Sequence, residues 1–316
     1  MPDLPTRELG RTGLNVTTMG YGAMELRGAA GGRGREIAPD DVGRILNAVL
    51  DSGINFIDTS PDYGESEEQI GRHISSRRAE YFLASKCGCL VAVEPTEGGP
   101  RHVYTRENIV AAVERSLTRM KTDYLDLVQF HGSPSKAELE EHDAIATLED
   151  LKAQGKVRFI GSSSTLPNLE EHIEMGVFDE FQIPYSALQR EHEDVITRAA
   201  EAGSGIVIRG GAARGAPSED KQWAGRLGGA GGAGGGSAAD LWQRARIDEL
   251  IEGEMDRMEF TMRFTLTHPD LHTTIVGTVN PDHLAQNLAA VAEGPLPEEL
   301  YEEAKRRLAE AGSAPA

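Results

Sequence analysis

Four residues whose side chains can donate or tune a proton each lie close behind an apolar run of the sequence. Asp58 follows INFI, Lys86 follows YFLAS, His131 follows DLVQF, and Tyr63 lies in the segment PDYGES just beyond Asp58. A phenol with a pKa of about 10 is a poor acid at neutral pH, but a neighbouring ammonium group lowers that pKa and a carboxylate can hold the ammonium in place. A histidine beside the phenol can orient a carbonyl oxygen or complete a proton relay. These residue types together predict a proton-donating site.

Each of the four residues also has a structural explanation. Asp58 can cap the following loop and Tyr63 can be an aromatic at a rim. Lys86 can form a structural ion pair, and His131 can be a buried, hydrogen-bonded histidine. Their shared position behind predicted strands is what favours catalysis. A hydrolase that uses Asp58 and Asp62 as paired carboxylates is an alternative, because one fold can host many reactions.

Eight short apolar runs alternate with longer amphipathic segments. Regular alternation of strands and helices predicts a parallel sheet with right-handed crossovers, and eight such units close as an α/β fold of the (β/α)₈ TIM-barrel type. A doubly wound open sheet is the alternative. In a barrel the functional side chains collect at the C-terminal ends of the strands, together with the long loops. The predicted strands are Thr17–Gly22, Ile54–Asp58, Tyr81–Lys86, Tyr124–Phe130, Val157–Gly161, Glu180–Ile183, Gly205–Ile208 and Thr273–Val276.

The amphipathic segments between the strands begin with residues that are typical of helix N-termini, such as proline followed by acidic residues. Residues 1–16 predict a β-hairpin that turns around Thr12–Gly13, and residues 295–316 predict a C-terminal helix and tail. We expect residues 1–316 to form a single barrel domain. The predicted helices begin at Pro39, Thr105, Pro167 and Pro281 or span Leu139–Leu151 and Glu191–Glu201.

Two glycine-rich segments interrupt the alternation, at 27–36 and within 217–239. Gly229, Gly231 and Gly234 match the G-x-G-x-x-G dinucleotide fingerprint, but no hydrophobic strand precedes them and no helix opens directly behind them. We therefore interpret 217–239 as a surface loop or lid. Trp223 and Trp242 are candidates for a pocket wall, although either can simply pack against the barrel.

The charge balance excludes several classes of protein. Acidic residues outnumber basic ones by 51 to 32, for a formal net charge of −19. That excess argues against nucleic-acid binding and against an anionic membrane surface. The start MPDLPTREL has no apolar core of a signal peptide, and no run approaches the roughly 20 apolar residues of a membrane span. We expect a cytoplasmic protein with no nucleic-acid or membrane partner.

Cys87 and Cys89 are the two cysteines of the chain. On a strand their side chains would lie on one face about 6.6 Å apart, which is long for a disulfide. A zinc site needs further close ligands, and no CxxC or HExxH pattern occurs. We expect reduced thiols and no metal.

The segment GINFIDTSPDYGESEEQIG at 53–71 resembles the signature of the aldo-keto reductase superfamily around its aspartate and tyrosine. The strands that end in ASK and QFH are similar to those that carry its lysine and histidine, and the resemblance extends from Arg7 to Asn287. It implies a barrel without a Rossmann domain and an NADPH-dependent reduction of a small carbonyl substrate. Tyr63 would be the general acid, Lys86 and Asp58 would tune it, and His131 would orient the substrate.

The resemblance also implies contacts with the cofactor. Ser163 replaces the usual asparagine, Gly277 stands where many members have a lysine, and His283 where many have an arginine for the 2′-phosphate. These departures weaken a strict preference for NADPH, so NAD is possible. NADPH is the first choice because it is the habit of the family that the sequence resembles. Arg209 and Arg214 could compensate. At the nicotinamide end the implied residues are Gly22, Ala23, Met24 and Asp58, with Ser162, Ser163 and Gln182 at the carboxamide and Tyr185 stacked on the ring. At the pyrophosphate they are Gly211, Ala212 and Ala213, with Gly277 and Thr278 at a phosphate. Toward the adenosine they are His283, Gln286 and Asn287.

Two questions stay open at this level. Some members of the superfamily that the sequence resembles use the barrel as a non-catalytic, nucleotide-sensing subunit of a larger assembly. Catalysis by this protein is therefore a prediction, with such a subunit as the alternative. The substrate is not identified, because specificity in such barrels comes from the long loops. The sequence leaves the oligomeric state open, with a monomer as our expectation.

Overall fold

The computed structural model describes residues 4–29, 36–96, 99, 101–213 and 238–316. Several features singled out in the sequence lie outside the described residues. They are Arg214, Trp223 and the glycine-rich segment 228–236 with its fingerprint-like glycines.

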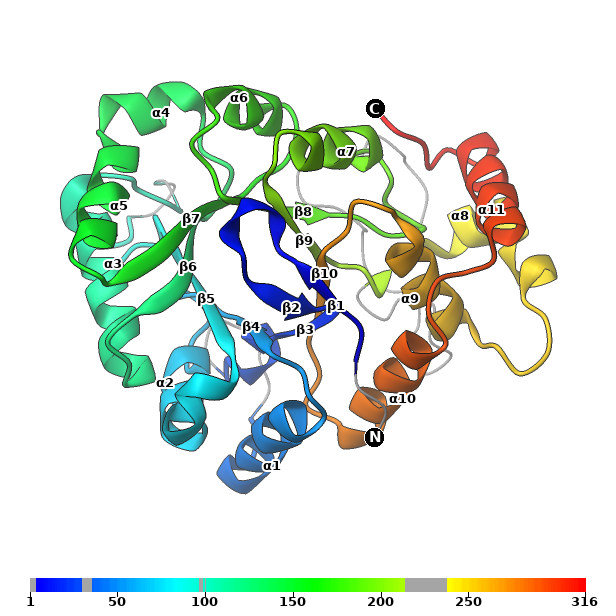
Figure 1. Ribbon diagram of the computed structural model, residues 1–316, viewed down its shortest axis with the longest axis horizontal. Coiled ribbons are helices and arrows are strands. Elements are labelled where there is room, and N and C mark those ends of the chain that lie inside the picture. Colours follow the sequence, from blue (N-terminus) through cyan, green and yellow to red (C-terminus); the bar gives the residue numbers. More distant parts are fainter. Residues whose placement is uncertain (1–3, 30–35, 97–98, 100, 214–237) are drawn as a thin grey trace.

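Eight parallel strands close into a barrel, as the alternation of strands and helices predicts (Figure 1). Around the barrel the order is β10-β3-β4-β5-β6-β7-β8-β9. This closure confirms the (β/α)₈ fold and excludes the open doubly wound sheet. The strands are β3 (Met19–Gly22), β4 (Phe56–Asp58), β5 (Phe82–Cys87), β6 (Leu125–Phe130), β7 (Val157–Ser163), β8 (Glu180–Pro184), β9 (Gly205–Arg209) and β10 (Thr273–Val276).

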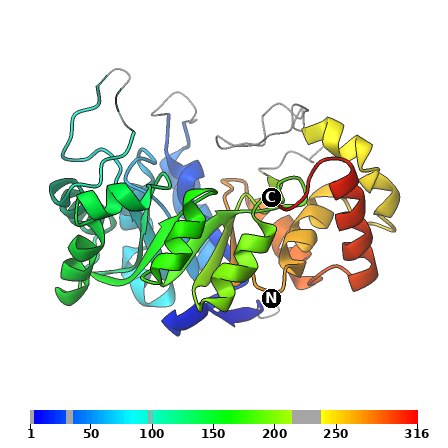
Figure 2. The ribbon, with the colours of Figure 1, turned by 90° about the horizontal axis from the view of Figure 1, so that it is seen from above.

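The predicted N-terminal hairpin closes one end of the barrel. Strands β1 (Thr6–Glu8) and β2 (Asn15–Thr17) pair antiparallel and are joined through the 3-10 helix η1 (Gly10–Thr12). Figure 2 shows the hairpin at one end of the barrel and the loops after the strands at the other. Gly10 has a φ of 50°, and a Cβ there would lie 2.2 Å from the backbone N of Gly205, so only glycine allows this close approach.

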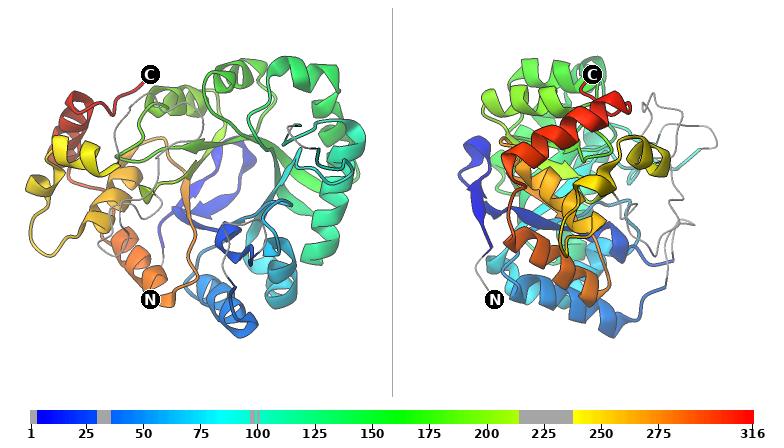
Figure 3. Two further views of the ribbon diagram at one scale, coloured as in Figure 1. Left: turned by 180° about the vertical axis from the view of Figure 1, so that it is seen from behind. Right: turned by 90° about the vertical axis from the view of Figure 1, so that its right-hand side faces the viewer.

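Helices cover the outside of the barrel (Figures 1 and 3). The predicted segment Leu139–Leu151 is divided into two helices, because Asp143 adopts a left-handed φ of 46° and ends the first one. Helix α2 was not predicted. The helices are α1 (Pro39–Asp51), α2 (Ser66–His73), α3 (Arg106–Met120), α4 (Lys136–Glu141), α5 (Ala144–Ala153), α6 (Asn168–Met175), α7 (Glu193–Glu201), α8 (Ala238–Arg244), α9 (Arg257–Thr267), α10 (Pro281–Ala292) and α11 (Glu298–Glu310), with the 3-10 helices η2 (Ala23–Leu26), η4 (Ser75–Glu80) and η6 (Ile247–Leu250).

The C-terminal helix α11 packs beside the α8–α9 region (Figure 3). Trp242 on α8 is 1% exposed, donates from Nε1 to Asp248 Oδ1 at 2.8 Å and packs edge-on against Phe260. It therefore packs within the helix layer rather than forming a pocket wall. Within the described ranges, no helix combines the length and the apolar character needed to cross a lipid bilayer.

The interior of the barrel changes from apolar to polar along the strands. Successive strand residues alternate between the barrel interior and the helix layer. Close to the hairpin the interior is filled by one apolar cluster, and beyond it lies a buried polar layer that faces the opposite end. The apolar cluster contains Leu9, Leu14, Val16, Phe56, Ala84, Leu127 and Val207. The polar layer contains Asp58, Lys86, Gln129, Glu180 and Gln182.

Candidate active site

Asp58 and Lys86 form a buried ion pair at the ends of β4 and β5. Asp58 pairs with Ala84 in the sheet, and Lys86 lies two residues farther along on the same face. The Lys86 ammonium donates to Asp58 Oδ1 at 2.8 Å, to Asp58 Oδ2 at 2.7 Å and to Thr59 O at 2.8 Å, which uses all three of its donors. Burial alone would lower the pKa of Lys86, but the Asp58 carboxylate outweighs it and the pKa is raised. Lys86 is therefore charged at any ordinary pH.

Tyr63 places its ring against this lysine. Its backbone N–H donates to Ser60 O at 3.1 Å, which closes the turn after β4, and Lys86 Nζ lies 5.1 Å from the centroid of the ring. Burial raises the pKa of the Tyr63 hydroxyl, and this effect exceeds the opposite effect of the Lys86 charge. Lys86 thus acts in the expected direction, while the net shift of the pKa is upward. Tyr63 keeps its proton at neutral pH, as a proton donor must.

His131 lies directly behind β6 and presents a neutral ring to Tyr63. Its backbone N–H donates to Cys87 O at 3.0 Å, and Tyr104 Oη donates to its carbonyl oxygen at 2.6 Å. The ring centroids of His131 and Tyr63 are 5.9 Å apart in an edge-on arrangement. Burial lowers the pKa of His131 to about 3, although the carboxylate of Asp62 opposes this shift. His131 can therefore exchange a hydrogen bond with a carbonyl oxygen without carrying a charge.

A chain of hydrogen bonds links the ion pair to β7 and β8. Ser163 Oγ donates to Gln182 Oε1 at 3.1 Å, and Gln182 Nε2 donates to Asp58 Oδ2 at 2.9 Å. Two of the residues predicted at the carboxamide, Ser163 and Gln182, are thus brought together beside Asp58.

Ser162 and Tyr185 do not join this group, and the structure corrects their predicted roles. Ser162 Oγ lies 2.7 Å from Ser164 Oγ and 3.3 Å from His172 Nδ1, with no exposed surface. Tyr185 is also fully covered; its Oη lies 3.1 Å from that of Tyr301 on α11. Alternation is the reason, since Ser162 on β7 and Tyr185, the residue directly after β8, both lie at helix-facing positions.

Small residues line the ends of β3 and β9. Ala23 begins η2 and is fully buried, whereas Met24 is 39% exposed. Ala212 and Ala213 are buried behind β9. The charge of Arg209, at the end of β9, lowers the pKa of both Tyr63 and His131. Gly22 ends β3 and Gly211 follows β9, where both are buried.

The remaining predicted cofactor residues lie at and after the end of β10. Gly277 is exposed, and a Cβ on it would lie 2.5 Å from Gly22 O, so the backbone has no room for a lysine at this position. Thr278 is buried, and its Oγ1 accepts from Asn280 N at 3.0 Å. On the surface of α10, His283 and Gln286 are exposed and Asn287 is half-buried.

Sequence reasoning missed a group of side chains around His131. Cys89 Sγ lies 3.3 Å from His131 Nδ1, and the His102 and His131 ring centroids are 4.8 Å apart. Asp62 Oδ2 lies 3.6 Å from the same Nδ1. Burial raises the pKa of Cys89 to about 12, so its thiol is protonated. No spacing motif could reveal this group, because its members come from separate loops.

The geometry disfavours the hydrolase alternative. Both carboxylate oxygens of Asp58 accept hydrogen bonds from Lys86, and one also accepts from Gln182. Asp62 Oδ1 accepts from Ser60 Oγ at 2.6 Å. Burial would raise the pKa of Asp62, but this hydrogen bond and the charge of Lys86 are among the interactions that lower it. Neither carboxyl is placed as a proton-carrying acid for hydrolysis.

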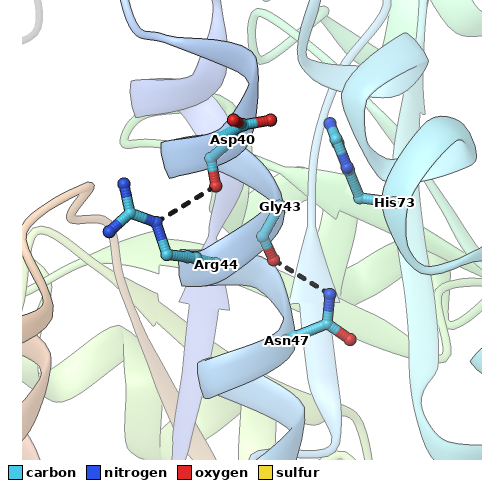
Figure 4. A pocket seen from close by; sticks show the side chains of 5 residues that line it. All are labelled: Asp40, Gly43, Arg44, Asn47 and His73. Atoms are coloured by element: carbon cyan, nitrogen blue, oxygen red, sulfur yellow. Dashed lines mark hydrogen bonds between the residues drawn. The ribbon is translucent and has the colours of Figure 1, made fainter.

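A depression of about 540 Å³ lies elsewhere, on the outer surface between α1 and α2 (Figure 4). Within it Arg44 Nε donates to Asp40 O and Asn47 Nδ2 donates to Gly43 O, both along α1. These are local helix contacts in the outer layer, so this depression is separate from the strand ends. Its lining residues are Asp40, Gly43, Arg44, Asn47 and His73.

The residues at the strand ends fit a nicotinamide group. A carboxamide offers both a donor and an acceptor, and the Ser163 hydroxyl and the Gln182 amide supply the complementary groups beside the ion pair. The small residues behind β3 and β9 suit the close approach of a dinucleotide to the backbone. A proton donor, a fixed positive charge and a neutral imidazole lie together there, which is a set suited to protonating a carbonyl oxygen.

Comparisons with known proteins agree with this arrangement. The model of the aldo/keto reductase family matches residues 18–307. An uncharacterized oxidoreductase, YqkF of Bacillus subtilis, is 29% identical over 307 residues, which cover 93% of each chain. The NADH-specific methylglyoxal reductase of Escherichia coli is 28% identical over 311 residues, which cover 90% of this chain and 92% of the reductase. The holo form of the aldo-keto reductase AKR11C1 from Bacillus halodurans superimposes with a TM-score of 0.81 at 27% identity, over 99% of this chain and 98% of that one.

Proposed function

Because the chain belongs to the aldo/keto reductase family, we propose that it reduces a small aldehyde or ketone to an alcohol with Tyr63 as the general acid. Members of this family are oxidoreductases that use nicotinamide cofactors. The observation that carries the proposal is the contact of Tyr63 with Lys86, whose Nζ lies 5.1 Å from the ring centroid and is fixed by Asp58. A protonated phenol beside a permanent positive charge can release its proton to an acceptor of increasing basicity.

A reduced nicotinamide held by these residues would supply a hydride to the carbonyl carbon. Tyr63 donates its hydroxyl proton to the carbonyl oxygen, which gains negative charge as the reaction proceeds. The Lys86 charge stabilises the phenolate that remains, and Asp58 keeps Lys86 from moving toward solvent. His131, being neutral, holds the carbonyl oxygen by a hydrogen bond and does not compete with Tyr63 as the acid. Ser163 and Gln182 orient the carboxamide.

NADPH is the coenzyme that we propose as preferred, with NADH as a usable alternative. His283, exposed on α10, is the residue we assign to the 2′-phosphate, while the close contact of Gly277 with Gly22 leaves no space for a lysine there. The NADH-specific reductase among the relatives is the reason that NADH is kept as an alternative. The ratio of kcat/KM for the two coenzymes tests the preference, and a ratio in favour of NADH would overturn it.

Replacing Tyr63 by phenylalanine tests the central role. General acid catalysis contributes about 10²–10⁴-fold, so Tyr63→Phe should lower kcat for an activated aldehyde by that range. Binding of NADPH, followed by its fluorescence, should change little because Tyr63 is proposed to act on the substrate oxygen. An unchanged kcat, or a parallel loss of NADPH affinity, would contradict the role.

The wild-type protein provides the control against a non-catalytic function. Tight NADPH binding without oxidation of the coenzyme, over a panel of aldehydes, keto acids and keto sugars, would instead support a nucleotide-sensing subunit.

A further inference from the structure

Four potential metal ligands from three separate segments meet at the mouth of the barrel. Asp62 lies in the loop after β4, Cys89 and His102 lie in the segment after β5, and His131 follows β6. One candidate ligand atom from each residue lies within 4.8 Å of all the others. Cys89 and His102 are held opposite each other by an isolated antiparallel bridge, which fixes the backbone of both.

The contacts inside this group leave ligand atoms available. His102 Nε2 is buried and has no hydrogen-bond partner among the described residues. Cys89 Sγ, 3.3 Å from His131 Nδ1, already points at the second imidazole. Asp62 Oδ2 approaches the same nitrogen at 3.6 Å, and Asp62 is itself exposed, so its carboxylate can shift without disturbing the core. The group is therefore partly closed and open on one side.

The donor set identifies the class of ligand. One thiolate, two imidazoles and one carboxylate suit a borderline-soft, tetrahedral cation, whereas Mg²⁺ and Ca²⁺ prefer oxygen ligands alone. Bonds of about 2.0–2.3 Å in a tetrahedron place ligand atoms roughly 3.3–3.8 Å apart, so the widest separations here must close by about 1 Å. We expect rotation of the Asp62 and His102 side chains to supply movements of that size.

We propose that Asp62, Cys89, His102 and His131 form an inhibitory site for a zinc-like divalent cation. Binding exchanges the Cys89 thiol proton, which leaves to solvent, for a sulfur–metal bond. The contacts of Cys89 and Asp62 both meet His131 at Nδ1, so the cation would bind that nitrogen. The imidazole ring is then fixed by the metal and can no longer turn to follow the carbonyl oxygen. Inhibition of reduction rests on the proposed function, whereas binding of the cation does not.

Titration of the whole protein with Co²⁺, in buffer free of thiols and chelators, tests the binding. Tetrahedral Co²⁺ bound to a thiolate gives a charge-transfer band that carboxylate and imidazole ligands alone do not give. The wild type should show this band at a stoichiometry of about one, and Zn²⁺ should displace it. Cys89→Ala should abolish the band, and Cys87→Ala should retain it, because Cys87 lies in the helix-side core.

His102→Gln provides the second variant, since it keeps the thiol and alters only one ligand. We expect its Co²⁺ affinity to fall at least about tenfold, with the wild-type circular dichroism spectrum retained. No thiolate band in the wild type, a band that survives in Cys89→Ala, or equal affinity in His102→Gln would each overturn the site.

Activity then separates the two proposals. Zn²⁺ should inhibit NADPH oxidation by the wild type and lose at least about tenfold of its potency against His102→Gln. A thiolate band without any carbonyl reduction would reject the proposed function and leave the metal site intact. If carbonyl reduction is unaffected at Zn²⁺ concentrations that fully displace the bound Co²⁺, the inhibitory role is rejected.

Discussion

Asp58 and Glu180 are two buried carboxyl groups of the same barrel interior, and they are held in opposite ways. Asp58 accepts two hydrogen bonds from the Lys86 ammonium and one from Gln182. Among the described residues, Glu180 accepts only from Gln129 Nε2, at 3.1 and 3.2 Å. Burial raises the pKa of Glu180 well above its ordinary value, and the charge of Asp58 adds to the shift. One carboxyl therefore shares an ion pair, while the other is a neutral acid.

The difference follows from position along the strands. Glu180 begins β8, whereas Gln182, two residues farther toward the mouth, reaches Asp58. A buried charge without a partner is costly, and a buried carboxyl without a cation takes up a proton instead. A second charge next to Asp58 would also compete for Lys86. The barrel thus places its ion pair at the level of Tyr63, where the proposed reaction uses a charge, and carries a neutral carboxyl below it.

Removing the cation should make Asp58 resemble Glu180, and it is the change with the largest expected effect. Lys86→Met keeps the aliphatic stem but leaves Asp58 buried without its partner, so we expect a loss of about 3–5 kcal/mol in the free energy of unfolding. Reduction should also become slower by at least about 10²-fold, because the phenolate of Tyr63 loses its stabilising charge. Urea denaturation and steady-state kinetics measure the two effects.

The double variant Asp58→Asn with Lys86→Met separates stability from catalysis. It contains neither charge, so most of the lost stability should return while the rate stays low. Full stability in the single variant Lys86→Met would show that Asp58 tolerates isolation, and would remove the contrast with Glu180.

Glu180→Gln tests the other half of the comparison. The pKa of Glu180 is higher in the folded than in the unfolded state, so its bound proton contributes to the free energy of unfolding. This contribution is fully present below the unfolded-state pKa of about 4.3 and is lost as the pH rises toward the folded-state pKa. The variant has no proton to lose. It should therefore gain about 1–3 kcal/mol over the wild type at pH 8 and little at pH 4.

The packing supports that substitution. Gln129 Oε1 is buried and has no hydrogen-bond partner among the described residues, so the new amide can donate to it. Thermal or urea unfolding at a series of pH values measures the difference. A gain of the same size at both pH values would mean that the new hydrogen bond, and not ionisation, is responsible.

The barrel was predictable because strand and helix periods differ, and apolar runs of the right length mark strands. Asp58, Lys86 and His131 could be picked out because each directly follows such a run. The local breaks were harder to see. The split between α4 and α5 depends on one left-handed residue, Asp143, whose neighbours keep a helical pattern.

Side-chain direction is what the sequence-based reasoning handled least well. Ser162 and Ser163 are adjacent, yet one faces the helix layer and the other the polar interior. An error of one residue in the predicted alternation exchanges the two faces. The same kind of error led to the prediction that Tyr185 stacks on the nicotinamide ring. Asp62, Cys89, His102 and His131 meet only because separate loops fold over the mouth, which is a tertiary arrangement without a sequence pattern.

The two serines provide the smallest and most selective test of the comparison, because only Ser163 belongs to the chain of hydrogen bonds that ends on Asp58. Ser163→Ala removes the donor to Gln182 Oε1 and should raise KM for the coenzyme about 2–10-fold, as a single hydrogen bond contributes about 0.5–1.5 kcal/mol. Ser162→Ala is the matched control: its hydroxyl contacts Ser164 and His172, so its loss should lower stability and leave that KM unchanged. An equal rise in KM for both variants would show that the effect does not depend on the hydrogen bond to Gln182. An unchanged KM in Ser163→Ala would show that Gln182 needs no partner on β7.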